Sequence, residues 1–364
     1  MNPKVAARQA RLLQMLENGD EIRIGRERDC PLPLAQLTRL TEDHPDVVKV
    51  YGQGLTAEVF HLKVEGHHWC LKRCRPDSLV ANVDGKTAFL TELERRREIE
   101  SLRELHPTIL SNVVCTSFGS ARAGVLVSPW LRGDPVRRLN ERNLAQMLAV
   151  EAELARWGWF DWDPSPGNLL DDGQQISVFD FGYMWPFDPL HEFNSNGLTD
   201  PAFHVAERLE TRTLSGLWLD QADPLPLFRH WRELCLAWAK GELQYLSREG
   251  ASAPVLARMQ GLVGEWSAAL ASEQALAANW WRDMYRSHRL DIADDLSGKS
   301  CGPMTLRRLD WLEQAVREHF PALADNLGFD EAGLGQAALL QRLGGLREQI
   351  RANLLPTRTS QPAR

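Results

Sequence analysis

Two carboxylates and one amide stand at a spacing that suits metal-assisted phosphoryl transfer. Asp163 and Asn168 are five residues apart in the segment Asp-Pro-Ser-Pro-Gly-Asn, whose prolines and glycine predict a loop. Asp180 follows after a short apolar strand. An in-line transfer needs a carboxylate that positions the attacking hydroxyl, and oxygen ligands that hold magnesium against the phosphates. We therefore expect Asp163 to orient or deprotonate a hydroxyl, and Asn168 and Asp180 to bind Mg²⁺.

Groups suited to phosphate oxygens precede this segment. An apolar strand leads to Gly52 and Gly54 and resumes at Val59. Glycines let a backbone approach phosphates closely, because no Cβ stands in the way. Lys72 lies between apolar neighbours in the strand His-Trp-Cys-Leu-Lys-Arg-Cys, and its ammonium is a compact charge for the same phosphates.

In this order, the pieces resemble the protein-kinase-like superfamily, in which a glycine-rich loop, a strand lysine, a D-x-x-x-x-N loop and a D-F-G turn follow one another. The resemblance implies an α+β, bilobal fold with a small β-rich N-lobe and a larger, mostly helical C-lobe. It also implies that ATP and Mg²⁺ are the cofactors. The segment Leu126 to Trp130 looks like the hinge that meets adenine. The expected nucleotide-binding residues are Gly52, Gly54, Val59, Cys70, Lys72, Ser128 and Trp130.

Lys72 needs an anchoring carboxylate, because the ammonium of a long, flexible side chain takes no fixed position without a partner. Glu98 is the best candidate, since Leu102 and Leu105 lie four and seven residues further on and would share its helix face against the sheet. Glu94 and Glu100 are the fallbacks. Catalysis is thus expected from Asp163, Lys72 and Glu98.

Cys70 and Cys74 flank Lys72 on the same side of a strand with a period of two. Cys70 takes the place where kinases put a small residue over the adenine ring. Both cysteines are also compatible with simple burial in the strand, since free cysteine is among the most buried residue types.

The resemblance has departures that bear on the acceptor. Trp162 replaces the arginine that reads a phosphorylated activation loop, Ser165 replaces a lysine near the transferred phosphate, and no A-P-E motif follows Gly182. The string from Asp163 is closer to bacterial atypical kinases of the UbiB type and to aminoglycoside or choline kinase-like proteins. The small lobe favours a protein Ser/Thr hydroxyl as acceptor. A small-molecule kinase and a catalytically silent binding module remain the alternatives.

Composition fits an enzyme with its own core. The chain has 364 residues, 43% of them hydrophobic and 25% charged, and a net charge of −7, which disfavours a nucleic-acid partner. No apolar run reaches the length of a membrane span, so we expect a cytoplasmic protein. The six cysteines lack metal-ligand spacing.

The expected organisation has four parts. Residues 1–45 form an N-terminal helical extension and a linker, 46–128 the N-lobe, and 129–355 the C-lobe with a helical C-terminal part. Residues 356–364 are expected to be a disordered tail. Helical spacing is clear in 305–320 and 337–354. Tryptophans 231, 238, 280, 281 and 311 are expected in helical cores, with an acceptor pocket as the alternative.

Overall fold

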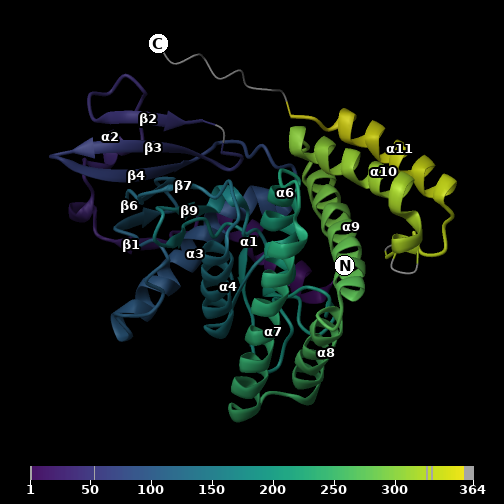
Figure 1. The fold of residues 1–364 in the computed structure, drawn as a ribbon. Coiled ribbons are helices and arrows are strands. Elements are labelled where there is room, and N and C mark those ends of the chain that lie inside the picture. Colours follow the sequence, from purple (N-terminus) through teal and green to yellow (C-terminus); the bar gives the residue numbers. More distant parts are fainter. Residues whose placement is uncertain (1, 53, 325–326, 329–330, 356–364) are drawn as a thin grey trace.

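A computed structural model describes residues 2–52, 54–324, 327–328 and 331–355. A small antiparallel sheet and a larger helical part share the chain, which confirms the predicted α+β, bilobal architecture (Figure 1). The sheet has six strands in the order β1-β5-β6-β4-β3-β2. Its strands are β1 (Arg23–Gly25), β2 (Val47–Tyr51), β3 (Ala57–Val64), β4 (His67–Cys74), β5 (Phe118–Ser120) and β6 (Val125–Pro129).

Strands β3 and β4 form the hairpin predicted at residues 65–68. Glu65 and Gly66 both have positive φ, 50° and 84°, which is the backbone that a tight two-residue hairpin needs. His67 and His68 already belong to β4. The turn sets the register of β3 and β4. Because directly opposed residues of an antiparallel pair point to the same face, the register decides which side chains lie on the same face as Lys72.

The first 45 residues contain more than a helix and a linker. Helix α1 (Pro3–Asn18) is followed by β1, which pairs with β5 and so adds an edge strand to the sheet. The short helices η1 (Glu27–Asp29) and α2 (Leu34–Leu37) come next. The predicted boundaries at 45, 128 and 355 stay predictions. The tail 356–364 lies outside the described residues.

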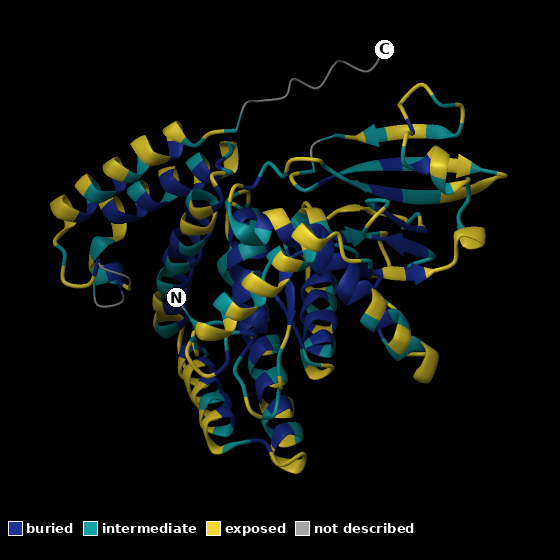
Figure 2. Cartoon of the chain, turned by 180° about the vertical axis from the view of Figure 1, so that it is seen from behind, coloured by how far each residue is buried: buried dark blue, intermediate teal, exposed yellow. Residues whose placement is uncertain are grey.

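Helix α3 (Val83–Leu105) begins 15 residues before Glu98, the residue around which the sequence predicts a helix. The Asn82 side chain caps it by accepting the Gly85 amide at 2.8 Å. Gly85 has no room for a side chain, because a Cβ there would lie 2.4 Å from Val80 Cβ. The first half of α3 is buried, whereas its C-terminal end projects into solvent (Figure 2).

The larger part holds two short sheets and the remaining helices. Its strands are β7 (Asp134–Pro135), β8 (Trp159–Asp161), β9 (Leu169–Asp171), β10 (Ile176–Val178) and β11 (Met184–Pro186), paired β10-β9-β7 and β11-β8. Its helices are α4 (Glu141–Arg156), η2 (Pro166–Asn168), α5 (Val205–Leu209), the π-turn η3 (Glu210–Leu214), α6 (Ser215–Trp218), α7 (Leu225–Arg248), α8 (Ala253–Ala269), α9 (Glu273–Gly298), α10 (Pro303–Ala324) and α11 (Gln336–Ala352).

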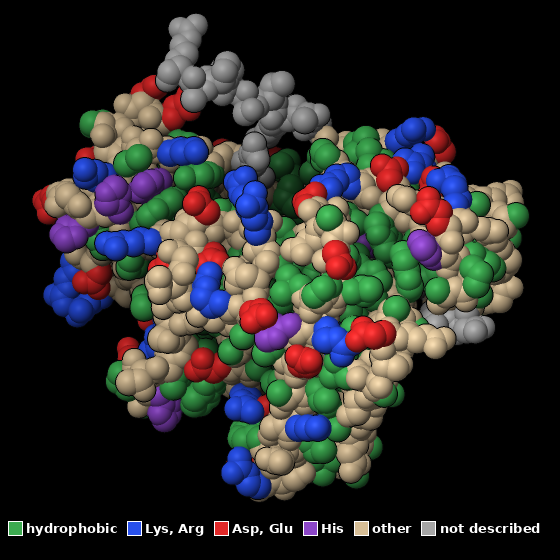
Figure 3. All heavy atoms as spheres, in the orientation of Figure 1, with side chains coloured by type: hydrophobic (Ala, Val, Ile, Leu, Met, Phe, Trp, Pro, Cys, Tyr) green, Lys and Arg blue, Asp and Glu red, His purple; other side chains and the backbone are tan. Residues whose placement is uncertain are grey.

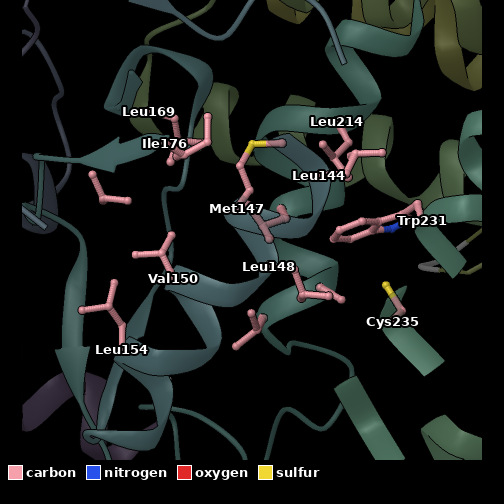
Figure 4. Close-up of a cluster of buried hydrophobic side chains, with 14 of the residues drawn as sticks. Leu144, Met147, Leu148, Val150, Leu154, Leu169, Ile176, Leu214, Trp231 and Cys235 are labelled. Atoms are coloured by element: carbon pink, nitrogen blue, oxygen red, sulfur yellow. The ribbon is translucent and has the colours of Figure 1, made fainter. Parts of the chain in front are cut away.

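Helix α4 is the centre of the main hydrophobic core. Leu144 and Leu148 are four residues apart and so share the face that packs toward Trp231 and Cys235 of α7, whereas Val150 and Leu154 point to the other side of the helix (Figure 4). Each fully buried leucine contributes roughly 1.5–3 kcal/mol to folding. This core fixes the position of β9 and β10, and hence of the loops that adjoin them.

The C-terminal helices confirm the predicted spans 305–320 and 337–354. Helix α10 packs on both α9 and α11, and the three helices contribute to a separate apolar core (Figure 1). In the described part of the chain, no helix is both long and apolar enough to cross a membrane.

A buried ion cluster links α7, η3 and α9. Arg232 is fully buried and donates to Glu210 at 2.7 Å, to Asp283 at 2.6 Å and to Asn279 at 2.7 Å. The charges of the two acids offset the cost of burying the guanidinium.

Replacement of Arg232 should destabilise the folded protein far more than replacement of Arg229, a more exposed arginine of the same helix. We expect Arg232→Met to lower the free energy of unfolding by about 3–5 kcal/mol, since two buried carboxylates lose the buried cation between them. The matched control is Arg229→Met, whose partner Glu273 has an 86% exposed side chain; it should cost below about 1 kcal/mol. Urea denaturation measures both, and equal losses would contradict the role of the cluster.

Candidate functional site

The Lys72 ammonium lies between two carboxylates that come from different elements. Its Nζ is 2.7 Å from Asp180 Oδ2, and it also forms an ion pair with Glu92 of α3. Glu92 is 1% exposed. Burial lowers the pKa of Lys72, but Asp180 and Glu92 outweigh it, so this pKa is raised above its usual value. The site therefore keeps a permanent cation where strand, helix and turn meet.

The expectation that Glu98 anchors Lys72 is wrong. Glu98 binds Arg95 at 2.7 Å and the indole nitrogen of Trp159 at 2.9 Å. Glu92 is six residues earlier, about 240° around the helix at 100° per residue, so the two acids face different ways. The assumed face also fails, because Leu105 is 75% exposed.

Neither fallback replaces Glu98. Glu94 forms a bidentate pair with Arg11 of α1 at 2.6 and 2.8 Å, and Glu100 accepts from Arg103 and from the Thr116 amide. A signal for Glu92 was present in the sequence. It is the acid inside the run Ala-Phe-Leu-Thr-Glu-Leu, and a carboxylate among apolar neighbours needs a buried cation.

The strand registers bring the other predicted nucleotide residues to one face of the sheet. Val59 is opposite Lys72, and Cys70 is opposite Ser128. Directly opposed residues of antiparallel strands point to the same side, so these four side chains share a face. Burial raises the pKa of the Cys70 thiol to about 11, which keeps it neutral.

Trp130 continues this face at the end of β6. Its amide donates to the His68 carbonyl at 3.0 Å, and its ring stacks on His61 with centroids 3.8 Å apart. His61 is opposite Cys70 in the β3–β4 register. An aromatic surface therefore adjoins the segment predicted to meet adenine.

The glycine-rich turn is held by a residue that the sequence did not single out. Arg75, just after β4, donates to the Gly54 carbonyl at 2.8 Å and to the Gly52 carbonyl at 2.5 Å. A Cβ on Gly54 would lie 2.3 Å from the Ala57 oxygen, so the backbone path requires glycine there. Arg75 thus fixes the turn at the end of the sheet face.

The segment from Asp163 to Asn168 is a compact loop held by hydrogen bonds of its own polar groups. The Asn168 amide nitrogen donates to the Asp163 carbonyl at 2.9 Å, which leaves its Oδ1 as an acceptor. The Asp163 amide donates to Asp161 Oδ1 at 2.8 Å. Asp180 is held by Lys72 and by the Gly182 amide at 3.1 Å. Burial raises the pKa of Asp180, but Lys72 lowers it more, so it stays ionised.

These residues fit a magnesium–nucleotide complex in kind. Mg²⁺ takes one or two protein oxygens and completes its shell with phosphates and water. An ionised Asp180 and Asn168 Oδ1, to which no described residue donates, are such a pair. Within the described residues, no three or more His, Cys, Asp or Glu side chains gather as a metal-binding group.

A second unpredicted residue binds the loop. Arg212 of the π-turn donates through Nε to Asp163 Oδ1 at 2.8 Å. Burial raises the pKa of Asp163 and Arg212 lowers it only in part. Nothing in the local sequence marks Arg212, because 49 residues separate it from Asp163.

The tryptophans are divided between core and surface. Trp231 is fully buried, as expected, and Trp280 is 6% exposed. Trp218, Trp280, Trp281 and Trp311 line a hollow of about 310 Å³. Hydrophobic side chains are seen there between α6 and α10 (Figure 3). Helix α9 carries Trp280 and Trp281 more than two turns before its contact with Arg212, so this hollow is separate from Asp163.

Neither a scan of protein-family models nor a search of curated proteins finds a match. Similar solved structures include WbdD with the kinase inhibitor LY294002, at 14% identity and a TM-score of 0.34, covering 62% of this chain and 48% of that one. Vaccinia related kinase 3 is 13% identical, with a TM-score of 0.28, covering 43% of this chain and 56% of that one. The chain thus spans about half the length of each. The likeness is coarse.

The two glutamates of α3 give a direct test of the corrected pairing. Glu92→Gln should weaken Mg–ATP binding or phosphoryl transfer by about 10²-fold, because Lys72 loses the partner that directs it. Glu98→Gln, the matched control on the same helix, should stay within about twofold of the unchanged chain. Calorimetry with Mg–ATP and a turnover assay measure this. A loss confined to Glu98→Gln would restore the original assignment.

Proposed function

We propose that this chain is an ATP- and Mg²⁺-dependent phosphotransferase that moves the γ-phosphate of ATP to a hydroxyl. The observation that carries the proposal is the bridge from Lys72 to both Asp180 and Glu92, beside the Asp163–Asn168 loop. This bridge gathers a phosphate-binding cation and a metal-binding carboxylate from opposite parts of the chain. A buried charge cluster of this kind is a candidate functional site on physical grounds.

Each residue has a task in the proposed reaction. Lys72, directed by Glu92, would bind the α- and β-phosphates. Asn168 and Asp180 would hold Mg²⁺, which would neutralise charge on the phosphate oxygens. Asp163 would accept the proton of the acceptor hydroxyl as the hydroxyl oxygen bonds to the γ-phosphorus and the bond from that phosphorus to the leaving oxygen of ADP breaks. Val59, Cys70, Ser128 and Trp130 contact the adenine end of the nucleotide.

The first candidate acceptor is a protein Ser/Thr hydroxyl, supported by the order of motifs in the small lobe. A small molecule is the second candidate, and one feature favours it. Helix α1 covers the segment after Gly182: Asn2 donates to the Asn196 carbonyl at 2.8 Å and Arg8 to Ser195 Oγ at 3.1 Å. A peptide would need that surface free. Transfer of labelled phosphate to proteins or to small alcohols and amino sugars distinguishes the two candidates.

Asp180→Ala separates an enzyme from a silent scaffold. We expect transfer and ATP hydrolysis to fall at least about 10²-fold at saturating Mg²⁺, since a ligand of the metal is lost. Asp172→Ala removes an exposed carboxylate from the β9–β10 turn and should leave turnover unchanged. Chelation of Mg²⁺ should stop turnover in the unaltered chain. Turnover of the Asp180→Ala chain equal to that of the control would contradict the metal assignment.

A further inference from the structure

The carboxylate of Asp163 has two oxygens in different situations. Oδ1 accepts from Arg212, whereas no described residue donates to Oδ2. The Asp163 side chain is 23% exposed, so the second oxygen is within reach of a substrate. The loop from Asp163 to Asn168 contains no cation of its own. The charge beside this carboxylate must therefore come from elsewhere in the chain.

The segment that contains Arg212 forms hydrogen bonds with three successive residues at the start of the loop. Arg208 donates to the Trp162 carbonyl at 2.9 Å, Arg212 donates to Asp163, and the Thr213 hydroxyl donates to the Pro164 carbonyl. The π-turn Glu210–Leu214 makes this possible, because an inserted residue changes the direction of the side chains that follow it. Such turns are frequent at functional sites.

Two further helices hold the other side of Arg212. Its Nη1 bonds Asp291 of α9, and Asp291 Oδ2 lies 2.6 Å from Arg308 Nε of α10. The Asp291 side chain is 8% exposed and that of Arg212 19%. A largely buried guanidinium between two carboxylates has little freedom, because leaving either of them strands a charge. The row Asp163, Arg212, Asp291, Arg308 therefore fixes one end of the catalytic loop.

We propose that Arg212 is a positioning residue: by binding Oδ1 it turns Asp163 so that Oδ2 faces the acceptor hydroxyl. This inference rests on the proposed function. In the step it serves, the hydroxyl proton passes to Oδ2, the hydroxyl oxygen bonds to the γ-phosphorus, and the bond from that phosphorus to the leaving oxygen of ADP breaks. Asp291 of α9 holds Arg212 in this orientation through its bond to Nη1, so α9 contributes to the site although it carries no recognisable motif.

The kinetic test compares Arg212→Met, Arg212→Lys and Asp291→Asn with an exposed arginine of α10. Among the described residues, the ion-pair partner of Arg307 is Asp220 at the surface, which makes Arg307→Met the matched control. We expect Arg212→Met to lower kcat by about 10²-fold while KM for ATP stays within about twofold, because positioning serves the transfer step and not nucleotide binding. The kcat of Arg212→Lys and of Asp291→Asn should lie between that of the unaltered chain and that of Arg212→Met. The control should match the unaltered chain.

Chemical rescue distinguishes positioning from general damage. Free guanidinium, at concentrations far below those that unfold the protein, should restore part of kcat to Arg212→Ala and none to Asp163→Ala. An Arg212→Met chain with unchanged kcat, or with a loss that lies mainly in KM for ATP, would overturn the proposal. Absence of rescue together with a large drop in thermal stability would overturn it as well, since Arg212 would then be structural.

A cycle of Asp163→Asn and Arg212→Met, measured by thermal unfolding, keeps the test independent of turnover. The two changes should be non-additive, with the double variant losing less than the sum of the single losses. Additive losses would show that the pair does not form in solution. An inactive unaltered chain with a non-additive cycle would instead reject the proposed function and leave the pair established.

Discussion

The buried ammonium of Lys72 is the interaction on which the site depends. A charge removed from water is costly unless carboxylates surround it, and removal of one member of a buried pair typically costs about 3–5 kcal/mol. Here the carboxylates come from α3 and from the turn after β10. The sheet, the helix and the larger part of the chain must therefore be held together at the point where phosphates would bind.

The same constraint extends through Arg96. This side chain donates to the second oxygen of Glu92 at 3.0 Å and to the Phe179 carbonyl, and its guanidinium lies over the Phe181 ring. Helix α1 adds a tie from the opposite side through Arg11 and Glu94. The orientation of α3 is therefore set by charged contacts on two faces, in addition to the apolar contacts of Phe89 and Leu93.

Sequence reasoning succeeded where a local pattern carries the information. A period of two placed Cys70, Lys72 and Cys74 on one side of a strand, and β4 is such a strand. The registers add Val59, opposite Lys72, and Ser128, opposite Cys70, to the same face. It failed for Glu98, because helical spacing shows which residues share a face but not which face meets the sheet. The buried half of α3 lies before Glu98, and the acid that matters was hidden in an apolar run. Strand β1 was missed because three residues carry no strand signal, and its partner lies far along the chain.

Long-range contacts account for the rest. Arg212 contacts the Asp163–Asn168 loop from 49 positions further along the chain, Asp291 binds Arg212 from 79 positions further still, and no spacing rule connects them. Through these two residues, the helical region after residue 204 contacts the loop, although its sequence carries no motif that indicates this.

The central claim is that Lys72, Asp180 and the Asp163–Asn168 loop receive a magnesium–nucleotide complex. A crystal structure with Mg²⁺ and a non-hydrolysable ATP analogue tests it most directly. The account predicts the metal on Asp180 and Asn168, Lys72 Nζ on the α- and β-phosphates, and the adenine ring against Cys70 and Ser128. A nucleotide bound elsewhere, or none bound at saturating concentration with the Lys72–Asp180 pair still closed, would contradict it.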